Sequence, residues 1–205
     1  MAKFIIVFLA LFCTGSHGYN RNTFERTRGC LQYNAKDGYE YVNPYFSLGN
    51  FRNVQISESG VKSLRMGIVG RNDGLIRLTS ARFPYNNIRV TEIVLAGWDN
   101  TKSQVRSFNQ LERNINRRNN PIVHTLEPTI GLMSEYSTLM FTMEIDRRGN
   151  VRLIKDGERD PFLEFRDQTI SSKFIGFGNR NFPVIYFYDC PLVYNDGVCE
   201  DNIFG

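Results

Sequence analysis

The sequence predicts an all-β protein: an antiparallel two-sheet sandwich of the jelly-roll or lectin-like kind, with an N-terminal extension. Short runs rich in β-branched and aromatic residues recur between residues 39 and 188, and Gly, Asn and Asp separate them. Helical periodicity is scarce over the same stretch. Many short strands joined by turn residues pack most economically as two stacked antiparallel sheets.

The clearest expected strand spans residues 139–145, where every odd position is apolar and two of the three even positions are polar. This alternation is typical of a half-buried antiparallel strand. Residues 147–150, Arg-Arg-Gly-Asn, then turn the chain into a second strand at 151–154, which predicts a hairpin. Further strands are expected at residues 75–79, 88–95, 103–108, 173–177 and 184–188.

The first residues predict secretion. Residues 4–12 form an apolar run that is too short to span a bilayer as a helix. Ser16 and Gly18 are the small residues that signal peptidase prefers before its cleavage site, so residues 1–18 are expected to be a signal peptide. An uncleaved anchor is the alternative. We expect a mature extracellular protein that does not associate with membranes.

The remaining chain divides, on its pattern, into three parts. Residues 19–70 are less regular and are expected to form an extension that packs on the sandwich. The β-sandwich domain is expected at residues 71–190, followed by a C-terminal tail at 191–205. The extension contains an aromatic cluster at residues 38–46, for which burial or edge packing is favoured over a ligand platform.

Three cysteines would remain in the mature chain: Cys30, Cys190 and Cys199. An extracellular location favours disulfides. The preferred pairings join Cys30 to Cys190 or to Cys199, and the local pair of Cys190 with Cys199 is the alternative. One thiol is left over in each case. Because it could link two chains, a homodimer, disulfide-linked or non-covalent, is among the expectations.

Charge and composition argue against several function classes. The formal net charge of +4 is too mild to indicate a nucleic-acid partner. The Arg-rich stretch at residues 111–120 offers a patch for an anionic partner as one alternative, but it lacks interleaved aromatics and is expected to be a solvated loop. Once the signal peptide is removed, His124 is the only histidine, so no zinc site or histidine relay is expected. His124 is assigned a surface or packing role in a loop.

Residues 95–106, Leu-Ala-Gly-Trp-Asp-Asn-Thr-Lys-Ser-Gln-Val-Arg, carry a family resemblance. They resemble the Gly-Gly-Trp-x-Asn-Thr-x-Ser-x-Ile-Arg signature of the farnesoic acid O-methyltransferase-like domain, which is common in secreted arthropod proteins. Ala96 replaces the first Gly, Met143 stands where a Trp is usual, and Phe187 falls near the family's final Trp. Together with similar segments that follow in the expected order, the resemblance covers roughly residues 73–188.

The resemblance implies methyl transfer from S-adenosylmethionine to a sesquiterpenoid carboxylate. A Rossmann-type methyltransferase needs a strand, a glycine-rich turn and a helix that receives the cofactor. The nearest glycine pair, in residues 67–70, is followed by turn residues instead of a helix start. We therefore expect no cofactor, no metal and no catalytic residue.

The signature supplies the candidate ligand-binding residues: Trp98, Asp99, Asn100, Lys102 and Arg106. An exposed indole packs on a sugar ring, while carboxylate, amide and cationic groups form hydrogen bonds with its hydroxyls. The alternative is structural. In that reading Trp98 is core, Asp99 and Asn100 form a turn, and a nearby serine hydroxyl caps it.

These observations favour a secreted, non-enzymatic recognition module whose partner is an extracellular glycan or another extracellular ligand. Two alternatives stay open. One is a farnesoic acid O-methyltransferase of the juvenile hormone route, as the resemblance implies. The other is a secreted carrier or structural protein that holds a small apolar ligand between its sheets, suggested by the 16 phenylalanines.

Overall fold

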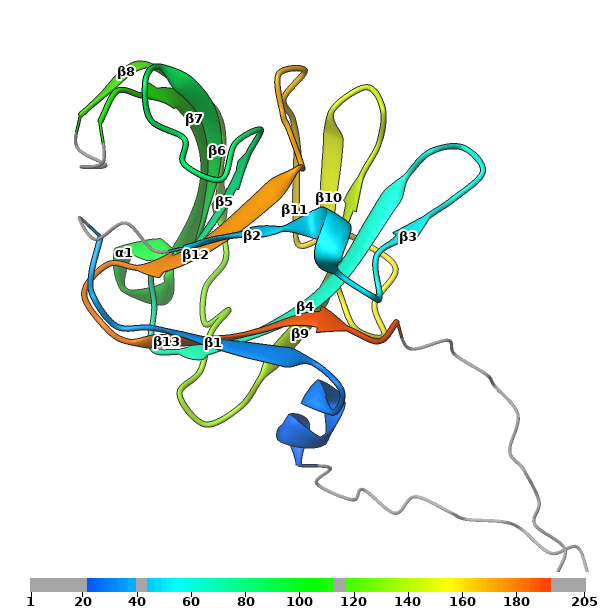
Figure 1. Ribbon diagram of the computed structural model, residues 1–205. Coiled ribbons are helices and arrows are strands. Elements are labelled where there is room, and N and C mark those ends of the chain that lie inside the picture. Colours follow the sequence, from blue (N-terminus) through cyan, green and yellow to red (C-terminus); the bar gives the residue numbers. More distant parts are fainter. Residues whose placement is uncertain (1–21, 40–43, 113–116, 193–205) are drawn as a thin grey trace, which may run out of the picture.

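The protein, seen in a computed structural model, is a sandwich of two antiparallel β-sheets (Figure 1). The structure describes residues 22–39, 44–112 and 117–192. The predicted signal peptide and Cys199 lie outside these described residues. Within them, no helix is long and apolar enough to cross a membrane.

The first sheet, sheet A, is built from seven strands: β1 (Leu31–Ala35), β3 (Gln55–Ile56), β4 (Lys62–Gly70), β9 (Leu139–Ile145), β10 (Asn150–Lys155), β11 (Leu163–Arg166) and β13 (Val184–Cys190). Its order is β1-β13-β4-β9-β10-β11, and β3 pairs with β4. All these pairings are antiparallel. The C-terminal strand β13 therefore lies between two N-terminal strands.

The second sheet, sheet B, is built from six strands: β2 (Tyr45–Ser47), β5 (Gly74–Thr79), β6 (Ile88–Ala96), β7 (Lys102–Gln110), β8 (Arg118–Pro128) and β12 (Phe174–Asn179). Its order is β2-β12-β5-β6-β7-β8. Helical turns are short: η1 (Thr23–Thr27), η2 (Leu48–Asn50) and α1 (Gly97–Asn100). Figure 1 shows β6, β7 and β8 strongly curved along their length.

The core lies between the two sheets and follows the side-chain alternation of each strand. Phe141 and Met143 of β9 face Ile76 and Ile93 of sheet B, and all four are fully buried. The Tyr186 hydroxyl is buried with them; it accepts a hydrogen bond from the Leu75 N–H and donates to the Gly178 carbonyl, both at 2.6 Å. Alternate residues of each strand consequently point away from the core.

The predicted fold class is confirmed, and so are the seven predicted strands, which correspond to β5, β6, β7, β9, β10, β12 and β13. The domain boundary expected at residue 70 has no structural counterpart. Residues 31–70 contribute strands to both sheets, and β4 lies near the middle of sheet A. Because seven successive β4 residues are buried, its sequence lacks the alternation that marks a half-buried strand.

The disulfide joins Cys30 to Cys190, one of the two preferred pairings, across a sequence separation of 160. Their Cα atoms lie 4.1 Å apart. The bond lies on the outer face of sheet A, in a small apolar cluster with Val69, Met140 and Phe187. It ties the chain before β1 to the end of β13.

Two loop assignments are corrected by the structure. The Arg-rich stretch ends in a strand, because β8 begins at Arg118, and His124 lies in the same strand. Two prolines and two register shifts against β7 obscured this strand in the sequence.

The His124 Nε2 atom lies 2.8 Å from Ser107 Oγ and 3.4 Å from the Asp167 carboxylate. Both contacts use the same ring nitrogen of His124. In a serine-histidine-aspartate relay, the serine and the aspartate contact different ring nitrogens of the histidine.

Candidate ligand-binding groove

A row of charged side chains crosses the outer face of sheet B. Arg77 of β5 is in register with Glu92 of β6, and Glu92 is in register with Arg106 of β7. Residues paired across antiparallel strands project to the same face. Because their neighbours Ile76 and Ile93 face the core, this row projects away from it.

Glu92 is the centre of the row and is fully buried. Its Oε2 accepts from Arg77 Nε at 2.7 Å, and its Oε1 accepts from Arg106 Nη2 at 2.6 Å and Nε at 2.9 Å. Burial by itself raises the pKa of Glu92, but the two guanidinium groups lower it more, so the pKa lies below its ordinary value. The carboxylate therefore stays ionised at neutral pH and holds both arginines in place.

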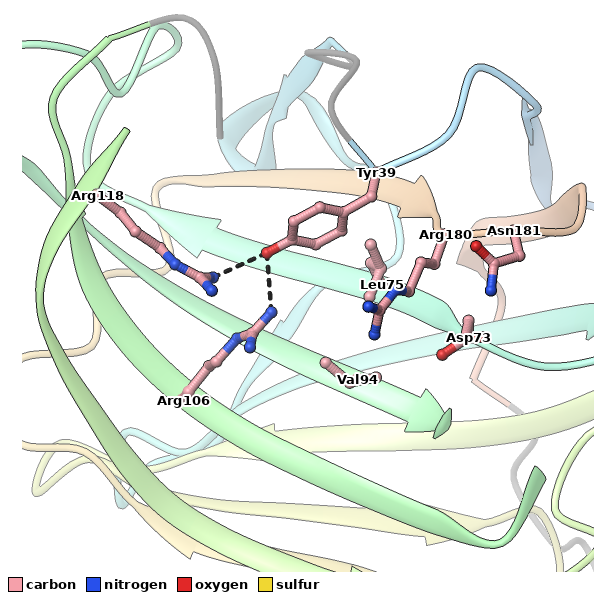
Figure 2. A pocket seen from close by; sticks show the side chains of 8 residues that line it. All are labelled: Tyr39, Asp73, Leu75, Val94, Arg106, Arg118, Arg180 and Asn181. Carbon is pink, nitrogen blue, oxygen red and sulfur yellow. Dashed lines mark hydrogen bonds between the residues drawn. The ribbon is translucent and has the colours of Figure 1, made fainter. Parts of the chain in front are cut away.

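Tyr39 lies over this row. Its hydroxyl accepts hydrogen bonds from Arg106 Nη2 and Arg118 Nη1, both at 2.8 Å (Figure 2). Burial, and then the Glu92 charge, raise the pKa of Tyr39 despite the opposing arginines. The phenol is therefore neutral. It fixes the position of two guanidinium groups without cancelling their charge.

A cavity of about 440 Å³ opens beside Tyr39, and a second of about 240 Å³ continues from it. The larger is lined by Tyr39, Asp73, Leu75, Val94, Arg106, Arg118, Arg180 and Asn181. The smaller shares five of these residues and adds Trp98, Asp99 and Gln104. We treat the two as one feature, the sheet B groove. Leu75 and Val94 give it an apolar floor, and charged and amide side chains surround this floor (Figure 2).

The turn at one end of the groove has an uncommon backbone. Ala96, Trp98, Asp99 and Asn100 all have positive φ, at 56°, 50°, 55° and 64°. The left-handed conformation costs an L-residue roughly 1–2 kcal/mol and is usually confined to single residues. The side chain of Trp98 is 51% exposed, and Asp99 is exposed as well. The turn thus presents an indole and a carboxylate beside the groove.

Hydrogen bonds from within the signature hold this turn. The Asn100 side chain donates to the Met133 carbonyl at 2.7 Å and accepts from the Met133 N–H at 3.1 Å. The Thr101 hydroxyl donates to the Trp98 carbonyl at 2.7 Å, and Ser103 Oγ accepts from the Ala96 N–H at 3.2 Å. Unfavourable backbone that is supported in this way is concentrated at functional sites.

The five predicted site residues fall into two groups. Trp98, Asp99 and Arg106 line the groove. Asn100 supports the turn, and Lys102 is exposed at the start of β7 outside the lining. The alternative that placed Trp98 in the core is wrong, whereas the turn and its serine cap are present as that alternative described.

Several groove residues were missed at the sequence level: Tyr39, Asp73, Gln104, Arg118, Arg180 and Asn181. Gln104 lies within the signature, Tyr39 within the aromatic cluster at residues 38–46 and Arg118 within the Arg-rich stretch. No local motif connects all six. One pattern was available: Arg77 and Glu92 each interrupt an apolar strand. Charged residues in such strands are seldom buried unless paired, so this pattern could have indicated an ion pair between β5 and β6.

A further cavity, of about 480 Å³, lies on the outer face of sheet A. Its buried arginine, Arg65, donates to the Asp156 carboxylate and to the carbonyls of Pro191 and Arg26. Across the described ranges, no group of three or more His, Cys, Asp or Glu side chains is placed to hold a metal ion.

The fold and groove define the class of protein: a jelly-roll-like β-sandwich with an open polar groove on one sheet. The sequence matches the farnesoic acid O-methyltransferase family over residues 39–192, which is more than half of the chain. The protein belongs to this family. A search of curated proteins by sequence found no match.

A comparison with solved structures found distant matches. A galectin of Caenorhabditis elegans, LEC-6, matches with a TM-score of 0.42 and 11% identity, over 73% of this chain and 94% of that chain. A β-glucanase of Bacillus licheniformis matches with a TM-score of 0.35 and 11% identity, over 79% and 97%. Matches this distant concern the fold alone, and we draw nothing from them about a ligand.

Proposed function

We propose that this protein is a non-enzymatic recognition module that binds a carbohydrate in the sheet B groove. The observation that carries the proposal is the half-exposed Trp98, which a supported left-handed turn presents beside hydrogen-bonding side chains. An aromatic face that is exposed at a structural cost has no role in the core of this fold.

The groove offers the chemistry that a sugar ring needs. One face of a pyranose is rich in C–H groups and packs on an indole such as that of Trp98. Its hydroxyls both donate and accept hydrogen bonds. Asp99 accepts, Arg106 donates, and Gln104 does both. The cavity of about 440 Å³ lies within the range of small-ligand sites.

The groove is also held in place before any ligand binds. Arg106 projects from a sheet strand and is fixed by Glu92 and Tyr39 through hydrogen bonds of 2.6–2.9 Å. The backbone of Trp98 is held by its turn, because the Trp98 carbonyl accepts a hydrogen bond from the Thr101 hydroxyl. Because these groups need not be ordered on binding, less of the interaction free energy is lost to conformational entropy.

We place this recognition outside the cell. The Cys30–Cys190 disulfide supports an oxidising compartment, in keeping with the predicted signal peptide at residues 1–18. The expected homodimer stays a prediction. Light scattering of the oxidised protein with and without reductant tests it, because only a disulfide-linked dimer would dissociate on reduction.

Trp98 gives the test a local reporter, since it is the only tryptophan in the sequence. We would screen the oxidised protein on a glycan array and titrate each hit in solution while following indole fluorescence. A saturable change in emission is the expected result. Calorimetry with Trp98→Ala should then show loss of binding, because the stacking surface is gone.

Ile56→Ala is the matched control. Ile56 is 67% exposed and lies on sheet A, so its removal should leave glycan affinity unchanged. Binding that survives Trp98→Ala would place the ligand elsewhere on the protein and contradict the proposed site. Silence across the array and in the fluorescence titrations would overturn the proposed function.

Family membership keeps a methyltransferase as the second candidate. Calorimetric titration with S-adenosylmethionine, followed by an assay for methyl farnesoate, tests it directly. If S-adenosylmethionine binds stoichiometrically and methyl farnesoate is formed, the protein is a methyltransferase and the proposal of a recognition module is wrong. The carrier alternative has less support, because several of the described phenylalanines pack against core aromatics between the sheets, as Phe177 does against Tyr186 at 4.7 Å.

A further inference from the structure

We infer that the ligand of the sheet B groove carries an anionic group, a carboxylate or a sulfate, that binds at the Arg118 end of the groove. This inference rests on the proposed function and names the class of saccharide. It follows from the balance of charge along the groove and from the positions of the three arginines that line it, Arg106, Arg118 and Arg180.

The first step is the charge around Tyr39. Arg77, Arg106 and Arg118 approach this phenol, and Glu92 is the carboxylate that pairs with the first two. Within the described part of the chain, no carboxylate lies within 4 Å of the Arg118 guanidinium, whose side-chain hydrogen bond goes to the neutral Tyr39 hydroxyl. This end of the groove therefore carries more positive charge than its own acids neutralise.

The second step is Arg180, which lies in the loop between β12 and β13. It is exposed, and no carboxylate of the described residues is within 4 Å of its guanidinium. Figure 2 shows Arg106 and Arg180 reaching into the cavity from opposite sides, above Val94. Guanidinium groups bind carboxylate and sulfate oxygens through charge-assisted, often bidentate hydrogen bonds.

The third step gives the ligand a direction. Arg118 lines only the larger cavity, whereas Trp98 and Asp99 line only the smaller. Asp73 lines both cavities. Burial raises the pKa of Asp73; the charge of Arg180 lowers it and the charge of Asp99 raises it, and the pKa lies above its ordinary value. Of these two acidic groups, Asp99 lines only the cavity at the indole end, and neither belongs to the Arg118 end alone. A saccharide would place a ring on Trp98 and its anionic substituent toward Arg118.

The experiment uses matched saccharides: glucose, glucuronic acid and glucose 6-sulfate, together with neutral and acidic pairs among the array hits. Trp98 emission reports binding at the groove in every case. The anionic member should bind about tenfold more tightly than its neutral match. Raising the salt from ~0.05 M to ~0.5 M should remove most of that preference, because salt screens charges in an open groove. The carboxylate and sulfate arms identify the source of the negative charge.

Arg118→Gln tests the assignment to one end of the groove. It should lower affinity for the anionic saccharide about tenfold and leave the neutral one nearly unchanged. Arg118→Lys should retain part of the preference, because it keeps the charge but loses the planar fork. The control is Arg152→Gln on β10 of sheet A, which removes the same charge from a partly exposed pair with Glu144.

Equal affinities for neutral and anionic saccharides, with a normal Trp98 response, would overturn this inference and leave the proposed function intact. A uniform loss of both ligands in Arg118→Gln would also overturn it, because it would assign Arg118 a structural role. If that variant does not fold, the exposed Arg180→Gln tests the need for positive charge in the groove, because Arg180 lines both cavities. It should weaken the preference for the anionic saccharide, and an unchanged preference would overturn the inference. No response to any saccharide would instead overturn the proposed function.

Discussion

The outer faces of the two sheets each bury an arginine, but they differ in what remains available. On sheet A, Arg65 is 3% exposed, and its donors bind the Asp156 carboxylate and two backbone carbonyls. On sheet B, Arg77 and Arg106 share the single carboxylate of Glu92, and the partly buried Arg106 lines an open groove. Burial is therefore a poor guide to the role of an arginine. A binding arginine differs from a structural one in the hydrogen-bond donors and the positive charge that the protein itself leaves without a partner.

The largest expected effect comes from breaking the ion pairs. Glu92→Ala leaves Arg77 buried and without its carboxylate, which should lower the free energy of unfolding by about 3–5 kcal/mol. Asp156→Ala should cost less, about 1–3 kcal/mol, because Asp156 is partly exposed and Arg65 keeps its carbonyl partners. Urea denaturation of both variants measures the difference. Equal losses would show that the two faces do not differ in this way.

The pH dependence of stability sharpens this comparison. Because the folded pKa of Glu92 lies below the ordinary value of 4.5, its ionisation stabilises the fold fully above about pH 4.5. That contribution is lost as the pH falls through the lower folded pKa. The stability difference between wild type and Glu92→Gln should therefore be largest near neutral pH and shrink below pH 4.5. A difference that stays constant into acid would contradict the assigned charge.

Next in size is the Cys30–Cys190 disulfide, which belongs to the sheet A side. It closes a long loop, with a sequence separation of 160, so the double variant Cys30→Ala/Cys190→Ala should lose about 2–5 kcal/mol. Thermal unfolding measures this loss. Since the bond lies on the face opposite the groove, glycan affinity of the folded double variant should match wild type. Reduced affinity would show that the two faces are coupled.

The sequence predicted strands in which apolar and polar residues alternate. In β9 they alternate because one face of the strand is buried more completely than the other. In β4 seven successive residues are buried, so its sequence shows no such alternation. The groove was predicted only at Trp98, Asp99 and Arg106, all within the signature, and Gln104 of the same signature was not singled out. Tyr39 and Arg118 are 79 residues apart in sequence and meet only through tertiary structure, which no local spacing reveals.

A smaller effect concerns the turn that distinguishes the sheet B side. Asn100→Ala removes two hydrogen bonds to Met133 and places alanine at a φ of 64°, so we expect a loss of about 2–3 kcal/mol. Asn100→Gly loses the same bonds but tolerates the backbone, and it should cost less. Chemical denaturation ranks the two. A reversed order would show that the left-handed backbone contributes no strain.

The smallest expected effect has the opposite sign and tests whether the turn is kept for binding. Asp99→Gly removes a side chain from a left-handed position, φ 55°, and should raise stability by about 0.5 kcal/mol while weakening glycan binding. Asn86→Gly is the matched control, since Asn86 is exposed at φ 61° in the loop between β5 and β6 and does not line the groove. It should affect stability similarly and leave affinity unchanged. Denaturation and Trp98 fluorescence measure the two quantities, and unchanged affinity in Asp99→Gly would remove that carboxylate from the binding site.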